Sequence, residues 1–301
     1  MDWSMLADPN ILTVLVLQGL VRGAMYALMG IGLSLIFGIL GVVNFAHGEL
    51  FMLGSYVMYL VVGIFGMPFY LGIVAAAGVV FVCGVAIERG LVEQLRRRAG
   101  RDWISDSFVL TIGLAVVLQN LAHLAFGSRQ YGVAELVAGS VPVGELEISL
   151  ERLAIFGLAC LAVLLLWAFM KFARTGRAIR AAAQNAEAAE TLGIDVRNLF
   201  TVTFGLGAAF AGVAGALLIS IYPASPTVGA EPLLKSFAVV VLGGLGNVSG
   251  AIAAGLLLGV LEAFTIFIAA DGWQNVLTAY LVILVLLVRP AGLFVLGGKR
   301  A

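Results

Sequence analysis

The chain has few charged residues and few of the residue types that carry catalysis. Only 11% of its 301 residues are charged, while 62% are hydrophobic; a typical soluble domain has about 25% charged residues. Its two cysteines, Cys83 and Cys160, lie inside apolar runs with no CxxC or histidine spacing, so we interpret them as small buried apolar residues rather than a disulfide or zinc site. This composition excludes an ordinary soluble protein and indicates one that crosses a membrane several times.

Several enzyme motifs are missing as well. There is no GxxxxGK[ST] loop to hold nucleotide phosphates and no HExxH pair, since His47 and Glu49 form only HxE. An enzyme would have to use His47 or His123, the two histidines, with a nucleophile for which no motif is present. Seventeen basic and seventeen acidic residues cancel, which gives no indication of a nucleic-acid partner. We therefore expect no catalytic site, no metal site, no bound cofactor and no ATP hydrolysis by this chain.

Long apolar stretches fill most of the sequence. A membrane helix needs about 20 apolar residues, and nine stretches of suitable character are present. They fall at about 11–40, 49–65, 67–87, 107–127, 152–172, 199–222, 234–246, 248–270 and 274–289. The first contains Arg22 and is too long for one upright helix, so it has room for a short interfacial piece before a proper span. We predict an all-α polytopic transmembrane helical bundle of about eight to ten spans, some of them broken, as a single domain over 1–301.

Glycine is abundant within these stretches. Of the 38 glycines, several recur at close spacing, as Gly255 and Gly259 do in a GxxxG pattern. Small residues at such spacing let helix backbones approach closely, and in lipid this packing takes the place of hydrophobic association. We expect a tightly packed bundle.

The basic residues indicate an orientation. The segments 88–106 and 171–198 and the C-terminal tail hold five, five and three of the seventeen Lys and Arg residues. Even numbers of expected spans separate these segments, and the positive-inside rule places all three in the cytoplasm. We expect the C-terminus inside and the N-terminus, with Asp2 and Asp8, outside.

Two polar breaks interrupt the apolar pattern. One runs from Asn44 through His47 to Glu49, and the other from Gly243 through Asn247 to Gly250. Short or glycine-interrupted segments in corresponding halves of a transporter point to its translocation path, so these two asparagines, His47 and Glu49 are candidate path residues. The alternative is a pair of tight turns in which both asparagines cap helices.

Four ionisable residues are expected at membrane depth: Arg22, Glu49, Lys235 and Glu262. Such residues are costly in lipid and are candidates for function. We expect Arg22 and Lys235 to reach the interface and Glu49 to lie near the cytoplasmic surface. Glu262 is the deepest and is a further path candidate, either facing a water-filled path or paired with Arg22. An ion-coupled carrier would use such an acid.

A polar segment from Lys171 to Asn198 separates two apolar stretches. Its alanines favour a slender helix, on which Arg177 and Arg180 share one face, and Gly193 suits a helix C-terminus. It has almost no large apolar residues, which argues against a helix resting on lipid headgroups. We interpret it as a segment that docks on a soluble partner.

Several motifs along the chain resemble those of one family. Glu187-Ala188-Ala189 followed by Gly193 resembles the coupling loop of bacterial ABC importer permeases, and the surrounding sequence is similar to that of the branched-chain amino-acid permeases. The N-terminal run from Gly23 to Leu33, Asn44-Phe-Ala-His-Gly48, and Gly243 to Ala251 are also similar to that family. A Leu-Pro downstream of Ile194 is absent, which distinguishes the chain from maltose-type permeases.

The resemblance implies a permease subunit of an ATP-driven ABC importer in the bacterial inner membrane, translocating branched-chain or related small amino acids. The family also includes importers of urea and short amides, and that substrate class remains an alternative. The implied partners are a second related permease, two cytoplasmic ATPases that hydrolyse the ATP, and a periplasmic binding protein. The residues implied to couple to an ATPase are Arg177, Arg180, Glu187, Ala188, Ala189 and Gly193.

Overall fold

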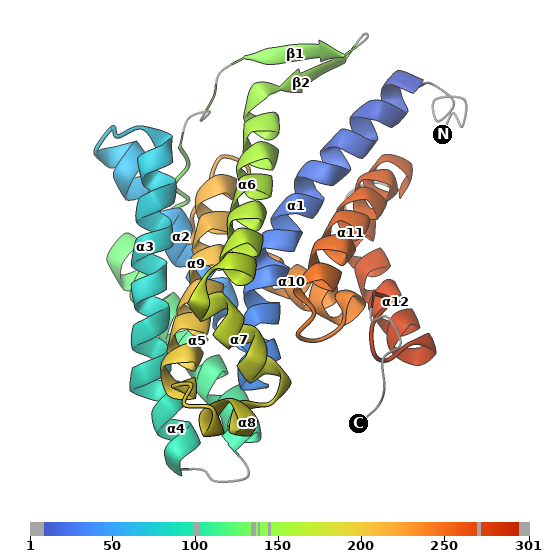
Figure 1. The fold of residues 1–301 in the computed structure, drawn as a ribbon. Helices are drawn as coiled ribbons and strands as arrows, with labels where there is room; N and C mark the ends of the chain where they lie inside the picture. Colours follow the sequence, from blue (N-terminus) through green and yellow to red (C-terminus); the bar gives the residue numbers. More distant parts are fainter. Residues whose placement is uncertain are drawn as a thin grey trace.

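The computed structural model describes residues 9–98, 103–133, 137, 139–143, 146–269 and 272–294. Asp2, Asp8 and the end of the C-terminal tail, on which the expected orientation partly depends, lie outside these residues. The described chain is a bundle of helices that lie roughly side by side (Figure 1). The predicted all-α polytopic bundle is confirmed.

Seven helices among the described residues are long and apolar enough to cross a membrane. They are α1 (Pro9–Leu40), α2 (His47–Met58) with the π-helix η2 (Tyr59–Ile64), α3 (Phe69–Ile87) with η3 (Glu88–Val92) and α4 (Glu93–Arg98), α5 (Trp103–Phe126), α6 (Leu150–Phe172), α9 (Val196–Leu218) and α11 (Val248–Ala269). The remaining helices are α7 (Arg174–Gln184), α8 (Ala186–Thr191), α10 (Ala230–Gly243) and α12 (Trp273–Val288).

The expected nine stretches and the seven long helices differ at two places. The stretches at 234–246 and 274–289 correspond to α10 and α12, which have only 14 and 16 residues. Both are shorter than the roughly 20 residues that cross a bilayer core. At the N-terminus, α1 is one continuous helix of 32 residues, with no separate interfacial piece.

Helix α1 lies at the centre of the bundle, where small residues bring backbones together. It packs closely against α11, and Gly23 of α1 faces Gly255 and Leu256 of α11 so closely that a Cβ there would lie 2.7 Å from the Cα of Leu256. The GxxxG pattern predicted this tight packing. The outer helices instead expose apolar side chains, such as Leu124 of α5 at 81% and Leu287 of α12 at 79%, which suits a surface in contact with lipid.

The sequence did not suggest the small hairpin. Strands β1 (Ser140–Val143) and β2 (Leu146–Ser149) pair antiparallel, with Ser140 opposite Ser149 and Val143 opposite Leu146. The hairpin lies beside the start of α6, at one end of the bundle, while α4, α7 and α8 lie at the other (Figure 1). We refer to these as the hairpin end and the α7–α8 end.

Candidate functional site

The polar segment 171–198 folds as two short helices joined at Asn185. The extended backbone of Asn185 ends α7. The side-chain oxygen of Asn185 then accepts a hydrogen bond at 2.9 Å from the backbone N–H of Ala188, and so caps α8. Gly193 follows α8 with a φ of +80°, and Ile194 N–H bonds back to the Ala189 carbonyl at 3.1 Å. The helix end expected at Gly193 is confirmed, whereas the break at Asn185 was not foreseen.

Most of the candidate coupling residues face solvent. Arg177, Arg180, Glu187, Ala188 and Gly193 are exposed. Ala189 differs, because it is 3% exposed and belongs to an apolar cluster with residues of α7 and α9. Its side chain therefore anchors α8 to the bundle and does not form part of an exposed docking face.

Sequence reasoning missed an exposed apolar residue in this segment. The side chain of Leu192, directly before Gly193, is 80% exposed. A single leucine gives no periodic signal, so only its position in the turn after α8 reveals it. Its place beside the exposed charges of this segment makes Leu192 a candidate contact with a partner protein.

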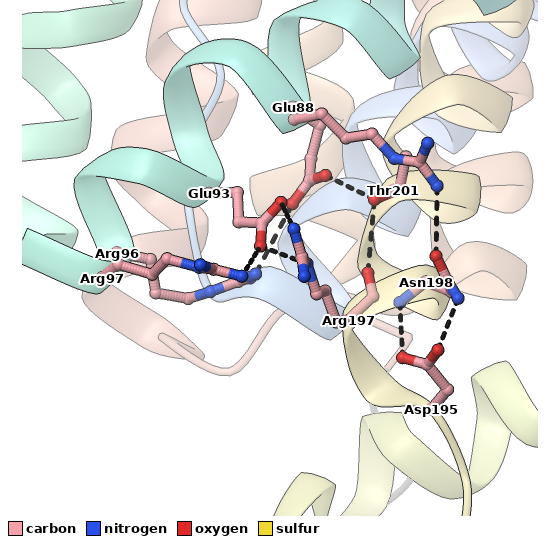
Figure 2. Close-up of polar contacts among 9 residues, drawn as sticks. Glu88, Glu93, Arg96, Arg97, Asp195, Arg197, Asn198 and Thr201 are labelled. Atoms are coloured by element: carbon pink, nitrogen blue, oxygen red, sulfur yellow. Dashed lines mark hydrogen bonds and ion pairs between the residues drawn. The ribbon is translucent and has the colours of Figure 1, made fainter.

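A charged cluster, in which buried carboxylates meet exposed arginines, joins the end of this segment to α4. Figure 2 shows Glu93 of α4 between two arginines, Arg97 and Arg197. Arg97 approaches Glu93 to 2.8 Å from within α4, and Arg197 reaches it from the first turn of α9, with Nη2 donating at 3.1 Å. Glu93 is only 3% exposed, and its two arginine partners supply the counter-charges that a buried carboxylate requires.

The second carboxylate of the cluster, Glu88, joins the same two elements. It accepts a hydrogen bond from Thr201 of α9 at 2.6 Å and lies 3.6 Å from Arg96 (Figure 2). Asp195, the residue between the coupling segment and α9, caps α9 by accepting from Asn198 N–H at 3.0 Å. The start of α9 is therefore held both by its own cap and by side chains from η3 and α4.

A cavity of about 500 Å³ lies at the α7–α8 end. Helices α1, α6 and α7 and the start of α11 contribute to its wall, with Ser34, Trp167, Ile179, Arg180 and Asn247 among the lining residues. One candidate coupling residue, Arg180, and one candidate path residue, Asn247, thus border the same space. Asn247 also accepts from the backbone N–H of Gly250 at 3.0 Å, so it caps α11, as the alternative interpretation held.

The first break places the start of α2 inside the bundle. Asn44 is fully buried and accepts from Ala46 N–H at 3.0 Å, and His47 Nε2 donates to the Met29 carbonyl at 3.1 Å. Met29 lies eleven residues before the end of α1, about 16 Å along the helix. Glu49, in the first turn of α2, is therefore not at the surface as expected, and it is 8% exposed.

The start of α2 meets the start of α10. A Cβ on Gly48 would lie 2.5 Å from the Gly229 carbonyl oxygen, and a Cβ on Gly229 would meet the Gly48 carbonyl in turn. Two short helices therefore begin against each other within the bundle, through backbone atoms. Residues 219–229, which lead from α9 to this point, overlap the gap between the expected apolar stretches 199–222 and 234–246.

Glu262 belongs to a buried ion pair. Its partner is Lys235 of α10, and the two side chains are 0% and 3% exposed. Tyr26 of α1 donates to Glu262 at 2.7 Å, and Thr278 of α12 donates to it at 2.6 Å. Arg22 bonds Gln274 instead, at 3.2 Å. The alternative in which Glu262 pairs with Arg22 and the expected reach of Lys235 to the interface are therefore wrong.

The five candidate path residues do not converge on one site. Asn247 borders the cavity at the α7–α8 end, Glu262 lies in the ion pair that joins α10 and α11, and the other three lie at the start of α2. No group of His, Cys, Asp and Glu among the described residues has the arrangement of a metal site. The exposed candidate coupling residues, in contrast, lie together on α7, on α8 and in the turn after α8.

Comparison with known proteins gives a consistent picture. The family model described as the permease component of branched-chain amino acid transport systems matches residues 15–288. The chain is 36% identical over 291 residues to the high-affinity branched-chain amino acid transport system permease protein LivH of Escherichia coli K12, covering 92% of this chain and 93% of the relative.

Two further relatives cover the chain equally well. The high-affinity branched-chain amino acid transport system permease protein BraD of Pseudomonas aeruginosa is 36% identical over 290 residues, with 92% of this chain and 93% of the relative covered. A probable branched-chain amino acid transport permease protein LivH of Methanocaldococcus jannaschii is 25% identical over 292 residues, with 93% and 91% covered. No solved structure matches the chain.

Proposed function

This chain belongs to the family of permease components of branched-chain amino acid transport systems, and we propose that it is the membrane-spanning permease subunit of an ATP-driven ABC importer for branched-chain amino acids. The observation that carries the proposal is the similarity to LivH and BraD over nearly the whole chain. It acts as a transport subunit, not an enzyme, and binds no cofactor of its own. ATP is hydrolysed by two partner ATPases, and a second permease and a periplasmic binding protein complete the importer.

The α7–α8 end is proposed to face the cytoplasm. The exposed arginines Arg177 and Arg180 lie there, and so does Arg97 of α4. The positive-inside rule places such residues on the cytoplasmic side. The C-terminus, which follows α12, lies on the same side of the inner membrane, and the hairpin end faces the binding protein.

Transport is proposed to follow alternating access. An ATPase that contacts α7 and α8 moves them when it binds ATP, and its different contacts with the two states shift the bundle between inward-facing and outward-facing forms. Ala189 joins α8 to α9, and the Glu93–Arg197 pair joins α9 to α4. Motion of the docking segment is thereby passed to α9 and to the α3–α4 helix together. Because α7 also borders the 500 Å³ cavity, the same motion changes the inner part of the path.

The ion-coupled alternative depends on Glu262 as a site for a proton or sodium ion. Lys235 already supplies a positive charge to that carboxylate, and Tyr26 and Thr278 donate to it as well. These contacts favour a structural role for Glu262 and support a motor-driven importer over a carrier.

Leu192 offers a direct test of docking. With the C-terminus tagged and the complex extracted in mild detergent, the wild-type chain should retain the ATPases and the second permease. Leu192→Glu should lower the retained ATPase about tenfold, which corresponds to a loss of about 1.4 kcal/mol of binding free energy, and leucine uptake should fall with it. The matched control is Leu245→Glu, a leucine 54% exposed in the turn between α10 and α11, which should retain both.

Two outcomes would contradict the proposal. Full retention and uptake in Leu192→Glu would remove the turn after α8 from the docking surface. A wild-type chain that purifies alone, homogeneous and active in transport, would instead favour a carrier without a motor.

A further inference from the structure

A second cavity, of about 90 Å³, lies in the half of the bundle toward the hairpin end. Its wall comes from the first half of α1, the end of α9 and the loop after it, and the first turns of α10 and α6. On the orientation proposed above, this cavity faces the side from which a binding protein would deliver substrate. None of the five path candidates lines it, although two residues of its wall, Tyr26 and Lys235, bond Glu262.

The cavity wall carries charges of both signs, and two of these charges have no partner among the residues that the structure describes. Arg152 of α6 and Glu231 of α10 both line it. Neither side chain makes a hydrogen bond or ion pair with another described residue, whereas Lys235 is paired with Glu262. Arg22 also lies in the wall and donates one hydrogen bond to Gln274. Because a guanidinium carries five N–H donors, Arg22 has further donors available. The cavity wall therefore presents positive and negative side chains to which a ligand can bind.

The rest of the wall is apolar. Met25, Met29 and Leu218 are at most 4% exposed and line the cavity together with Ile221. Methionine side chains are flexible and adapt to apolar groups of different shape. A few convergent polar groups on an apolar wall are typical of sites for small molecules.

We propose that this outer cavity is a transit site for a zwitterionic amino acid with an aliphatic side chain, released into it by the binding protein. Arg152 and Arg22 receive the α-carboxylate, Glu231 receives the α-ammonium group, and the apolar wall receives the side chain. The inference rests on the proposed function, because it takes from it both the substrate class and the direction of delivery.

Size and chemistry agree with this assignment. On the measure by which one water needs about 10–15 Å³, the 90 Å³ cavity holds about six to nine water-sized groups, which is comparable with a small aliphatic amino acid. Hydrogen bonds between ionised partners are stronger than those between neutral groups, and a guanidinium can bind a carboxylate in a bidentate geometry. The zwitterion supplies both of the counter-charges that Arg152 and Glu231 lack, so an uncharged solute of the same size gains much less there.

The test measures leucine transported per ATP hydrolysed. The complete importer is reconstituted in proteoliposomes with its binding protein, and Arg152→Gln and Glu231→Gln are compared with wild type. Each variant should lower the ratio about tenfold, which is the effect of losing one hydrogen bond to a charged group. ATP hydrolysis stimulated by the binding protein should be unchanged, because neither residue lies near the docking segment. A merely structural defect would reduce both rates together.

Matched controls are available at the same end of the bundle. Arg129 and Glu147 are exposed and do not line the cavity, so Arg129→Gln and Glu147→Gln should keep the wild-type ratio. A wild-type ratio in Arg152→Gln and Glu231→Gln, or an equal fall in transport and hydrolysis, would overturn the transit site while leaving the importer intact. Absence of leucine uptake by the wild-type complex would overturn the proposed function, and the transit site with it.

Discussion

At the scale of single residues, the pair formed by Lys235 and Glu262 is the most consequential contact within the bundle. Both side chains are nearly inaccessible, and Tyr26 and Thr278 complete the hydrogen bonding of the carboxylate. Taking two charges out of water is costly, and their attraction offsets that cost only while both are present. The pair joins α10 to α11, and Thr278 extends it to α12.

This arrangement predicts strong coupling between the two positions. Lys235→Met and Glu262→Gln should each destabilise the protein by about 3–5 kcal/mol, because each leaves one buried charge or its partners unsatisfied. The double variant should lose much less than the sum, since no unpaired charge remains. Thermal unfolding in detergent, for wild type, both single variants and the double variant, measures the difference. Additive losses would show that the two side chains do not act as a pair.

At the scale of elements, the two short helices α2 and α10 depend on glycine where they meet. A side chain on Gly48 has no room, because the Gly229 carbonyl would lie 2.5 Å from its Cβ. We expect Gly48→Ala to destabilise the bundle by about 1–3 kcal/mol, as overpacking does. Yield of monodisperse protein and the temperature of unfolding in detergent are the measurements.

The matched control lies on α3. Gly78 is exposed, and a Cβ there would meet no atom within 4 Å. Gly78→Ala should stabilise the helix by up to about 1 kcal/mol, because alanine has the higher helix propensity. If both substitutions shift the unfolding temperature in the same direction, the role of Gly48 is not to allow close packing.

At the scale of the whole molecule, the orientation of the bundle is the property most open to a simple test. The proposed topology puts the α7–α8 end and the C-terminus in the cytoplasm. A fluorescent protein that folds only in the cytoplasm should be bright when fused after Ala301, and an alkaline phosphatase that folds only outside should be inactive there. The matched fusion within the hairpin, after Val143, should give the reverse pattern. Reversal of both results would show that the bundle has the opposite orientation in the membrane.

The sequence predicted much of this architecture because lipid imposes simple rules. Apolar length located the seven long helices, and Gly193 correctly ended α8, because both are local signals. The depth at which α2 begins was not predictable, since it depends on the contact between His47 and Met29, which are far apart along the chain.

The site was predicted only in part, for the same reason. The exposure of Arg177, Arg180 and Glu187 follows from a polar helix between apolar spans. The partner of Glu262 does not follow from the sequence, which suggested Arg22; only the packing of α10 against α11 brings Lys235 to this carboxylate. Arg152 and Glu231, which come together at the outer cavity, lie 79 positions apart in separate helices and share no motif.

The meeting of α2 and α10 has a consequence for how the bundle changes shape. Elsewhere, packed helices interlock through side chains, and a shift between them requires new rotamers. Between Gly48 and Gly229 the contact is made by backbone atoms, and the side chain of Leu233 in α10 also lies beside Gly48. A contact with so few side-chain atoms requires few rotamer changes when helices shift, so we expect shear between α2 and α10 to be centred here.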